Sequence, residues 1–300
     1  MLVLAPVEWL ELVAEQLAIG PCTSVAFGKP SLGSDDAPAR FDFVRTYIAE
    51  GDDTPRLREL IERKLASLAD ASGVAELASL HVRFRRLPPE DFATSWRKSW
   101  KPLRVGSLAI VPPDWRGTLR AGDRRLLLEP GGAFGTGRHP TTRGCLRAIQ
   151  AHVRRGERVL DAGCGSGILA VASVLCGATS ALGFDNDATA LPYANELALQ
   201  NGVAGACEFR AGAFDVLGES DRDFDGCLAN IYADLIQAHA RDLAERLRPG
   251  GWFAFSGCVS SKREATLAAI AGAGLELREL ATRGRWDTFS GVRPISPARG

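Results

Sequence analysis

The 300-residue sequence lacks several features that would place it in a specialised class of protein. Lysine plus arginine and aspartate plus glutamate each number 36, and this balance argues against a protein whose main partner is a nucleic-acid backbone or an anionic membrane. The seven cysteines include no C-x-x-C pair, so we predict no structural zinc and no other metal site. No apolar run reaches about 18 residues, and the N-terminus has no basic segment of the signal-peptide kind. We therefore expect a cytoplasmic globular protein with reduced cysteines.

The features that are present divide the chain into three parts. Residues 1–88 read as helix, two strands, helix and strand, and a further strand over Leu2–Ala5 would complete a small ferredoxin-like α+β domain. Pro88–Pro89 marks a boundary, and residues 89–123 are expected to form a linker. The linker is rich in tryptophan and basic residues, which fits either packed inter-domain aromatics or a surface that touches a partner.

The remaining residues, 124–300, have the pattern of an α/β domain. Strand-like runs, beginning with RRLLLE, alternate with helical runs. This alternation predicts a Rossmann-like, doubly wound and mostly parallel sheet covered by helices on both faces. The short RGR connection near the end predicts an antiparallel last strand.

A glycine-rich turn is the first candidate for a ligand site. The segment ERVLDAGCGSGILAVASVLC reads as a strand, a turn and a helix, and Gly163 and Gly165 would let a ligand approach the backbone closely. The dinucleotide fingerprint G-x-G-x-x-G requires a third glycine at position 168, which is Ile168 here. The spacing is instead G-x-G-x-G after Asp161, which matches the first motif of Rossmann-like methyltransferases.

Two polar residues end the strands that follow. Asp185 ends ALGFD about 20 residues after the turn, where a carboxylate can accept hydrogen bonds from ribose hydroxyls. It could instead cap the next helix, and Asp187 is the second candidate for the ribose. Asn230 ends FDGCLANI, where its amide could hold a cofactor or accept a hydrogen bond from a substrate amine. The simpler alternative for Asn230 is an ordinary turn residue.

A second glycine-rich segment, EPGGAFGTGRHPTT, precedes a predicted helix. Its four glycines are typical of a loop that closes over a bound ligand, although an ordinary flexible loop is the alternative. Pro140 fits the first helical position, and Thr141 and Thr142 follow in the first turn. Their hydroxyls and the helix N-terminus could bind a ligand carboxylate.

Several runs together resemble the PrmA family, which methylates ribosomal protein L11: GAFGTGRHPTT, VLDAGCGSGILAVAS, GFDND, LANI and RPGGWFAFSG. The resemblance covers about Glu90 to Gly257 and is weak over the first 80 residues. It implies S-adenosylmethionine as cofactor and a substrate-recognition role for the N-terminal domain. The implied acceptors are amino groups of L11, namely lysine side chains, with the N-terminal amine as a further candidate.

Carried over residue by residue, the resemblance assigns cofactor contacts to Thr142, Gly163, Asp185 and Asn230, and Gly165 belongs to the same turn. The chain departs from the family pattern in GFDND, where the family has GIDID, and in NIYA, where it has NILA. Neither departure removes a proposed contact.

The chemistry requires a neutral nucleophile held about 3–3.5 Å from the methyl carbon. A lysine amine must therefore lose its proton, which an apolar pocket favours. No dedicated base is required, and Asn230 is the candidate catalytic residue. His139 is either a base or a residue that shapes the covering loop. Residues that could wall the site are Phe134, Tyr232 and Trp286.

Three other functions remain as alternatives. The acceptor could be a lysine of another protein or a small molecule, but a separate N-terminal domain favours a macromolecule. A nicotinamide dehydrogenase is disfavoured by Ile168. A non-catalytic adaptor is disfavoured by the intact glycine turn and by Asp185.

Overall fold

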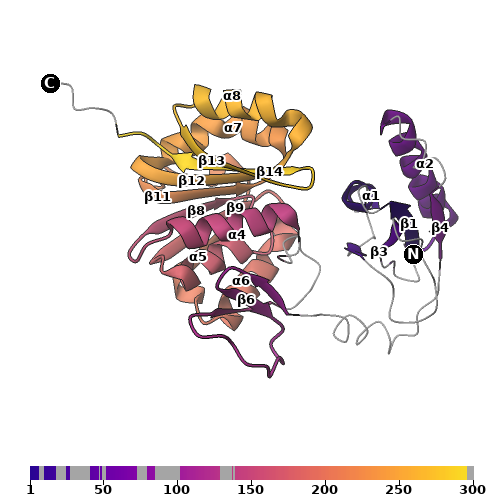
Figure 1. Cartoon of the computed structure of the whole chain (residues 1–300), viewed down its shortest axis with the longest axis horizontal. Coiled ribbons are helices and arrows are strands. Elements are labelled where there is room, and N and C mark those ends of the chain that lie inside the picture. The colour runs from indigo at the N-terminus through magenta and orange to yellow at the C-terminus, as the bar shows by residue number, and fades with distance from the viewer. Residues whose placement is uncertain are drawn as a thin grey trace. The chain divides into compact units, whose positions relative to one another are not determined.

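The computed structural model describes residues 1–6, 10–17, 25–27, 41–46, 48, 52–72, 80–84, 102–128, 137 and 139–295. The chain divides into two compact units, Met1–Trp100 and Lys101–Gly300 (Figure 1). In the part of the chain that is described, no helix is long and apolar enough to cross a membrane.

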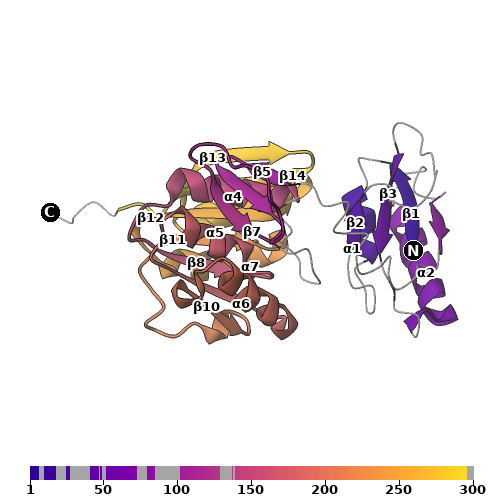
Figure 2. The same ribbon diagram turned by 90° about the horizontal axis from the view of Figure 1, so that it is seen from below.

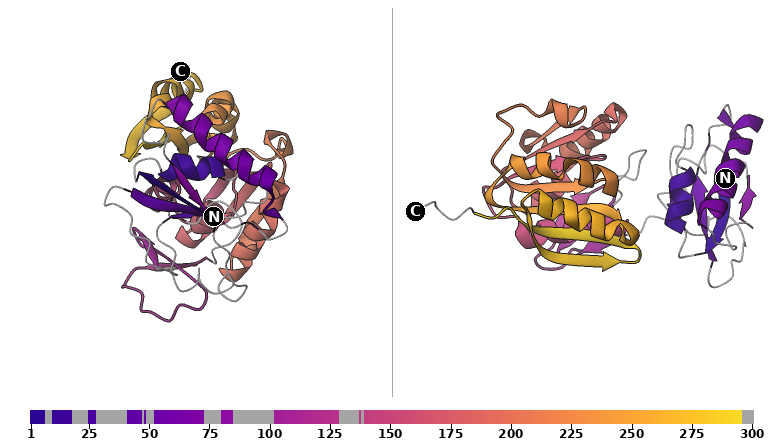
Figure 3. Two further views of the ribbon diagram at one scale, coloured as in Figure 1. Left: turned by 90° about the vertical axis from the view of Figure 1, so that its right-hand side faces the viewer. Right: turned by 90° about the horizontal axis from the view of Figure 1, so that it is seen from above.

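The first unit is a small α+β sandwich. Its elements are β1 (Leu2–Pro6), α1 (Leu10–Leu17), β2 (Val25–Phe27), β3 (Phe41–Thr46), α2 (Pro55–Ser72) and β4 (His81–Arg83). The strand order is β2-β3-β1-β4, and every pair is antiparallel. Both helices bury apolar residues against the sheet, and Val13 and Ile61 belong to the same core cluster as Val3 and Val44. Figure 3 shows the ribbon of this unit from two sides. The ferredoxin-like arrangement and the additional first strand are confirmed.

The second unit begins with a three-stranded sheet. It consists of β5 (Leu103–Val105), β6 (Leu108–Val111) and β7 (Arg124–Leu127), in which β5 and β6 are antiparallel and β6 and β7 are parallel (Figure 2). The run RRLLLE, which opens the predicted strand–helix alternation, therefore pairs outside the large sheet.

Two amides fix this small sheet to helices of the second unit. Gln150 accepts hydrogen bonds from Ser107 and donates to the Val105 carbonyl. Asn201 accepts from the backbone N–H of Leu127 at 2.8 Å and donates to its carbonyl at 2.8 Å. Residues 102–128 are thus attached to the second unit and belong to it.

The large sheet has the order β10-β9-β8-β11-β12-β14-β13. Its elements and the helices between them are α4 (Pro140–His152), β8 (Arg158–Ala162), α5 (Ile168–Cys176), β9 (Ser180–Asp185), η4 (Ala188–Ala190), α6 (Leu191–Gln200), η5 (Ala204–Ala206), β10 (Cys207–Ala211), η6 (Phe214–Val216), β11 (Phe224–Asn230), α7 (Ala233–Arg246), β12 (Leu247–Val259), η7 (Ser260–Lys262), α8 (Arg263–Gly272), β13 (Glu276–Arg283) and β14 (Trp286–Val292). Strands β8 to β12 pair in parallel, whereas β14 is antiparallel to both β12 and β13. The predicted doubly wound sheet with an antiparallel last strand is confirmed.

Helices cover both faces of this sheet. Helices α7 and α8 lie on one face, and α4, α5 and α6 lie on the other (Figures 1 and 3). The inner strands of the sheet are accordingly largely apolar on both sides, and the buried core includes Phe224, Phe253, Phe255 and Phe289.

The strand order fixes where a ligand can bind. From β8 the chain proceeds outward through β9 to β10, and from β11 it proceeds in the opposite direction to β12. The crevice at the carboxyl ends of β8 and β11 is therefore the switch point at which open α/β sheets bind ligands. Both the glycine turn after β8 and Asn230 at the end of β11 lie at this edge.

Candidate functional site

The glycine turn after β8 has a backbone that only glycine adopts easily. Gly163, Gly165 and Gly167 have φ values of +69°, +50° and +75°. A Cβ on Gly163 would lie 2.3 Å from Cγ2 of Ile231, and a Cβ on Gly167 would lie 2.9 Å from Cβ of Ala194. Side chains at these positions would therefore break the packing of the turn against its neighbours.

Asp185 is tied directly to this turn. Its Oδ2 accepts a hydrogen bond from the backbone N–H of Gly165 at 2.7 Å, and its Oδ1 accepts from the N–H of Asp187 at 2.9 Å. Asp187, rather than Asp185, caps η4, because its Oδ1 accepts from the N–H of Thr189. The capping alternative considered for Asp185 thus belongs to Asp187, and Asp185 is joined to the candidate cofactor turn.

Asp161 is an unusual residue to which the sequence pattern assigned no role. Its side chain is completely buried at the end of β8, and Oδ2 accepts a hydrogen bond from the N–H of Ala170 at 3.1 Å. Oδ1 has no hydrogen-bond partner within the described residues. Burial, with a contribution from the nearby Asp185, raises the pKa of Asp161 to about 7. A buried oxygen of this kind fits a ligand that brings a cationic group.

The first turn of α4 meets the end of β11. Thr142 is fully buried, and its Oγ1 accepts a hydrogen bond from Nδ2 of Asn230 at 3.3 Å. The structure therefore brings two of the predicted site residues into direct contact. In the described part of the chain, no hydrogen bond is present at Oδ1 of Asn230.

His139 is the N-cap of α4. Its Nδ1 accepts a hydrogen bond from the N–H of Thr141 at 3.3 Å and lies 2.6 Å from the Thr141 hydroxyl oxygen. Burial lowers the pKa of His139 to about 4, so the ring is neutral near pH 7 and is a weak proton acceptor. This geometry makes His139 the cap of α4 and does not favour it as a base.

The residue after Asn230 is clamped between two glycines. Ile231 touches the position that a Cβ on Gly163 would fill, and its N–H donates to the carbonyl of Ser256 at 3.2 Å. On the other side, a Cβ on Gly257 would lie 2.1 Å from the Ile231 carbonyl oxygen. This clamp fixes the backbone that presents Asn230. No sequence pattern identified it, because it depends on contacts between separate strands.

Two of the three predicted wall residues are described. The Trp286 ring lies 4.9 Å from the His139 ring in an edge-to-face arrangement at 70°. Tyr232 precedes α7 and is 63% exposed. Phe134 and the rest of the predicted covering loop, residues 129–136, lie outside the described residues.

Comparisons with known proteins identify the family. The family model described as ribosomal protein L11 methyltransferase (PrmA) matches residues 22–294. The ribosomal protein L11 methyltransferase of Pelotomaculum thermopropionicum is 38% identical over 245 residues, covering 81% of this chain and 77% of that protein. The protein of the same name from Chloroflexus aurantiacus is 32% identical over 317 residues, covering 96% and 95%.

A solved structure agrees with this result. The crystal structure of a ribosomal protein L11 methylase from Lactobacillus delbrueckii subsp. bulgaricus superimposes with a TM-score of 0.59 at 28% identity, covering 65% of this chain and all of that chain. The resemblance inferred from the sequence motifs is confirmed, and the dehydrogenase and adaptor alternatives are set aside. The chain belongs to the PrmA family of ribosomal protein L11 methyltransferases.

Proposed function

We propose that this protein transfers methyl groups from S-adenosylmethionine to amino groups of ribosomal protein L11, acting on lysine side chains and on the N-terminal amine. The observation that carries the proposal is the hydrogen bond between Asn230 and Thr142. It joins the end of β11 to the first turn of α4 at the switch point of the sheet, beside the glycine turn. Family membership supports both the reaction and the acceptor.

The cofactor half of the site lies along β8 and β9. S-adenosylmethionine, when bound, supplies a methyl group on a cationic sulfonium. Gly163 and Gly165 would allow close approach to the backbone, and Asp185 would accept from the ribose hydroxyls. The hydroxyl of Thr142 and the N-terminus of α4 would hold the methionine carboxylate. Asp161 supplies a buried carboxyl group, which a cationic ligand group would hold in its charged form.

Asn230 would serve both halves of the site. Its Nδ2 donates to Thr142, and so its Oδ1 remains to accept a hydrogen bond from the acceptor amine. Such a bond would orient the nitrogen lone pair toward the methyl carbon, which is the main contribution an enzyme makes to an in-line displacement. No general base is assigned, because the amine can release its proton to water after an apolar environment has lowered its pKa.

The two units would divide the work. We assign residues 1–88 to acceptor recognition and 124–300 to cofactor binding and catalysis. Residues 89–123 lie between these parts, and residues 102–123 of this segment are fixed to the second unit. The complete set of cofactor candidates lies in the last part, which supports this division. A ribosomal acceptor implies a cytoplasmic location, and no nucleic-acid contact is needed for the reaction.

The proposal is tested by incubating the purified protein with radiolabelled S-adenosylmethionine and the separated proteins of the large ribosomal subunit. We expect label in L11 alone, and no label when L11 is omitted. Label in a different protein would show that the chemistry is right and the acceptor wrong. No label in any protein, together with no binding of S-adenosylmethionine, would reject the function.

A further inference from the structure

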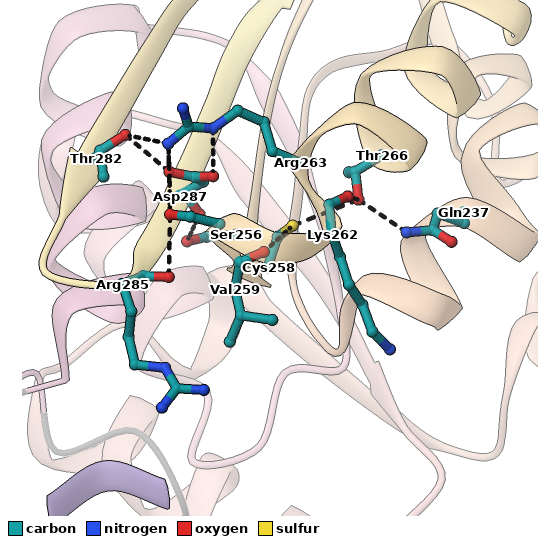
Figure 4. Close-up of polar contacts among 11 residues, drawn as sticks. Gln237, Ser256, Cys258, Val259, Lys262, Arg263, Thr266, Thr282, Arg285 and Asp287 are labelled. Carbon is teal, nitrogen blue, oxygen red and sulfur yellow. Dashed lines mark hydrogen bonds and ion pairs between the residues drawn. The ribbon is translucent and has the colours of Figure 1, made fainter. Parts of the chain in front are cut away.

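The start of β14 is held by an arrangement of side chains that the proposed reaction does not explain. Ser260 donates to the Arg285 carbonyl from its backbone N–H at 2.8 Å and from its hydroxyl at 3.2 Å. Ser256 donates from its hydroxyl to the Asp287 carbonyl at 2.9 Å. Arg285 and Asp287 are drawn in Figure 4, and Trp286 is the residue between them in the chain.

A buried ion pair supports the same segment. The side chain of Asp287 is fully buried, and its two carboxylate oxygens accept hydrogen bonds from Nε and Nη2 of Arg263, each at 2.8 Å. The hydroxyls of Thr282 and Ser260 donate to Oδ1 at 2.8 and 3.2 Å. Burial alone would raise the pKa of Asp287, but the hydrogen bonds from Arg263 and Thr282 outweigh burial and lower it. The carboxylate is therefore charged and fully paired (Figure 4).

The strand ladder itself is irregular at this point. The register of β12 and β14 shifts between Ser256 and Cys258, so that Cys258 pairs with Asp287 and Val259 with Trp286. A bulge of this kind re-aims a side chain and removes regular ladder hydrogen bonds. The side-chain network adds support at Trp286, the first residue of β14.

Trp286 connects this network to the catalytic candidates. Its ring packs edge-to-face against His139, the N-cap of the helix whose first turn carries Thr142. Helix α4 can approach β14 because residue 144 is glycine: a Cβ there would lie 2.0 Å from Oγ1 of Thr288. Trp286 is thus linked through His139 and α4 to the Thr142–Asn230 bond.

The sheet order places Trp286 on the acceptor side. Gly163 and Asp185 follow β8 and β9, on one side of β11, whereas Trp286 begins β14, on the other side. Asn230, at the end of β11, lies between these two groups. A cofactor bound along β8 and β9 leaves the β14 side for the acceptor, where an indole ring can pack on a lysine stem and attract its methylated, cationic product.

We propose that Trp286 is the acceptor-side wall that determines how well L11 binds, and that Arg263 and Asp287 are positioning residues that act through Trp286. This inference rests on the proposed function. Under this proposal, Arg263 and Asp287 hold the Trp286 ring in place in addition to stabilising the fold.

The test is a double-mutant cycle on the full-length enzyme with L11 as acceptor. Trp286→Ala should raise KM for L11 at least about fivefold, the lower range for a cation–π contact, while the Kd for S-adenosylmethionine stays within about twofold. Asp287→Asn should raise KM in the wild type but add nothing in the Trp286→Ala background, because its effect passes through that ring. The control is Asp225→Asn. Asp225 is bonded to Arg248 near the start of β11, away from Asn230 at the end of that strand, and its substitution should change neither the KM for L11 nor the Kd for S-adenosylmethionine.

A second measurement does not depend on the acceptor. With 5-fluorotryptophan incorporated, the ¹⁹F resonance missing from Trp286→Phe identifies Trp286. That resonance should move in Asp287→Asn and in the doubly neutral variant Arg263→Gln/Asp287→Asn, but not in Asp225→Asn. If it did not move, or if Asp287→Asn reduced kcat/KM equally in both backgrounds, the positioning role would be overturned. An unchanged KM in Trp286→Ala would contradict the proposed role of Trp286 in binding L11. Failure of the wild type to methylate L11 would contradict both the proposed function and this role.

Discussion

Asn230 donates a hydrogen bond to Thr142 over 3.3 Å, although 88 residues separate them in the chain. The contact is possible because β11 ends where α4 begins, and because the clamp on Ile231 fixes the backbone that follows Asn230. It makes the amide of Asn230 asymmetric in function. The N–H₂ side belongs to the protein, and the carbonyl side is available to a substrate.

This asymmetry predicts different results for two substitutions. Asn230→Ala should reduce kcat at least about tenfold, equivalent to 1.36 kcal/mol of barrier, with little change in melting temperature. Asn230→Asp keeps an oxygen for the acceptor amine and loses only the N–H₂ donor that bonds Thr142. Asp should therefore retain more activity than Ala in steady-state methylation of L11. Wild-type turnover by both variants would show that Asn230 is only a turn residue.

Substitution of Asp185 should affect cofactor binding, whereas substitution of Asp187 should affect stability. Asp185→Ala should weaken S-adenosylmethionine binding by about 1.5–3 kcal/mol, the range for a hydrogen bond to a charged group. Asp187→Ala should leave the affinity unchanged and cost about 1 kcal/mol of stability, because it removes the cap of η4. Calorimetric titration and thermal melts of both variants provide the comparison. A larger loss of affinity in Asp187→Ala would reverse the assignment.

Asp161 should make stability depend on pH. Its pKa in the folded chain is about 7, above the ordinary value of 3.8, so the native state binds more protons than the unfolded chain between these values. The free energy of unfolding should then fall as pH rises from about 4 to about 7. Asp161→Asn should remove this fall and raise Tm at pH 8 by about 2–4 °C for each kcal/mol recovered, while weakening cofactor binding.

A paired aspartate provides the control for this experiment. Burial of Asp221 is outweighed by the hydrogen bond from Arg210, so the pKa of Asp221 is lowered and its charge is present throughout that pH interval. Asp221→Asn should therefore leave the slope between about pH 5 and 7 unchanged, although it lowers stability overall. The same slope in Asp161→Asn as in the wild type would contradict a protonated Asp161.

Removal of the first unit tests the division of labour. A fragment of residues 101–300 should still bind S-adenosylmethionine, because it holds every cofactor candidate and retains the Gln150 and Asn201 contacts that fix residues 102–128. Its kcat/KM on L11 should fall at least about a hundredfold, since the local concentration supplied by docking is lost. Undiminished activity of the fragment on L11 would place acceptor recognition in the second unit.

The residues themselves explain which parts could be predicted from the sequence. Periodicity and glycine spacing predicted the four-stranded and seven-stranded sheets and the edge at which the candidate site lies, because strand ends and turn glycines leave local patterns. The same local logic led to Asp185 and Asn230. It misplaced β7, because RRLLLE looks like any strand and its partner β6 is chosen by tertiary contacts such as those of Asn201.

Other features of the site and its surroundings leave no local pattern in the sequence. Histidine is not a favoured N-cap residue, so the cap formed by His139 was not expected. The Arg263–Asp287 pair joins residues 24 positions apart on different elements, and the unpaired oxygen of Asp161 is a property of burial. These depend on packing and could be found only in the structure.

The central claim is methyl transfer from S-adenosylmethionine to amino groups of L11, and mass spectrometry of the product tests it most directly. Purified L11 is treated with the wild-type enzyme or with Asn230→Ala, digested and sequenced by fragmentation. The account predicts methyl groups on lysine side chains and on the N-terminal amine after treatment with the wild type, and at least about tenfold less modification with the variant under initial-rate conditions. Unmodified L11 after treatment with a wild type that binds S-adenosylmethionine, or methyl groups only on atoms other than amine nitrogens, would contradict it.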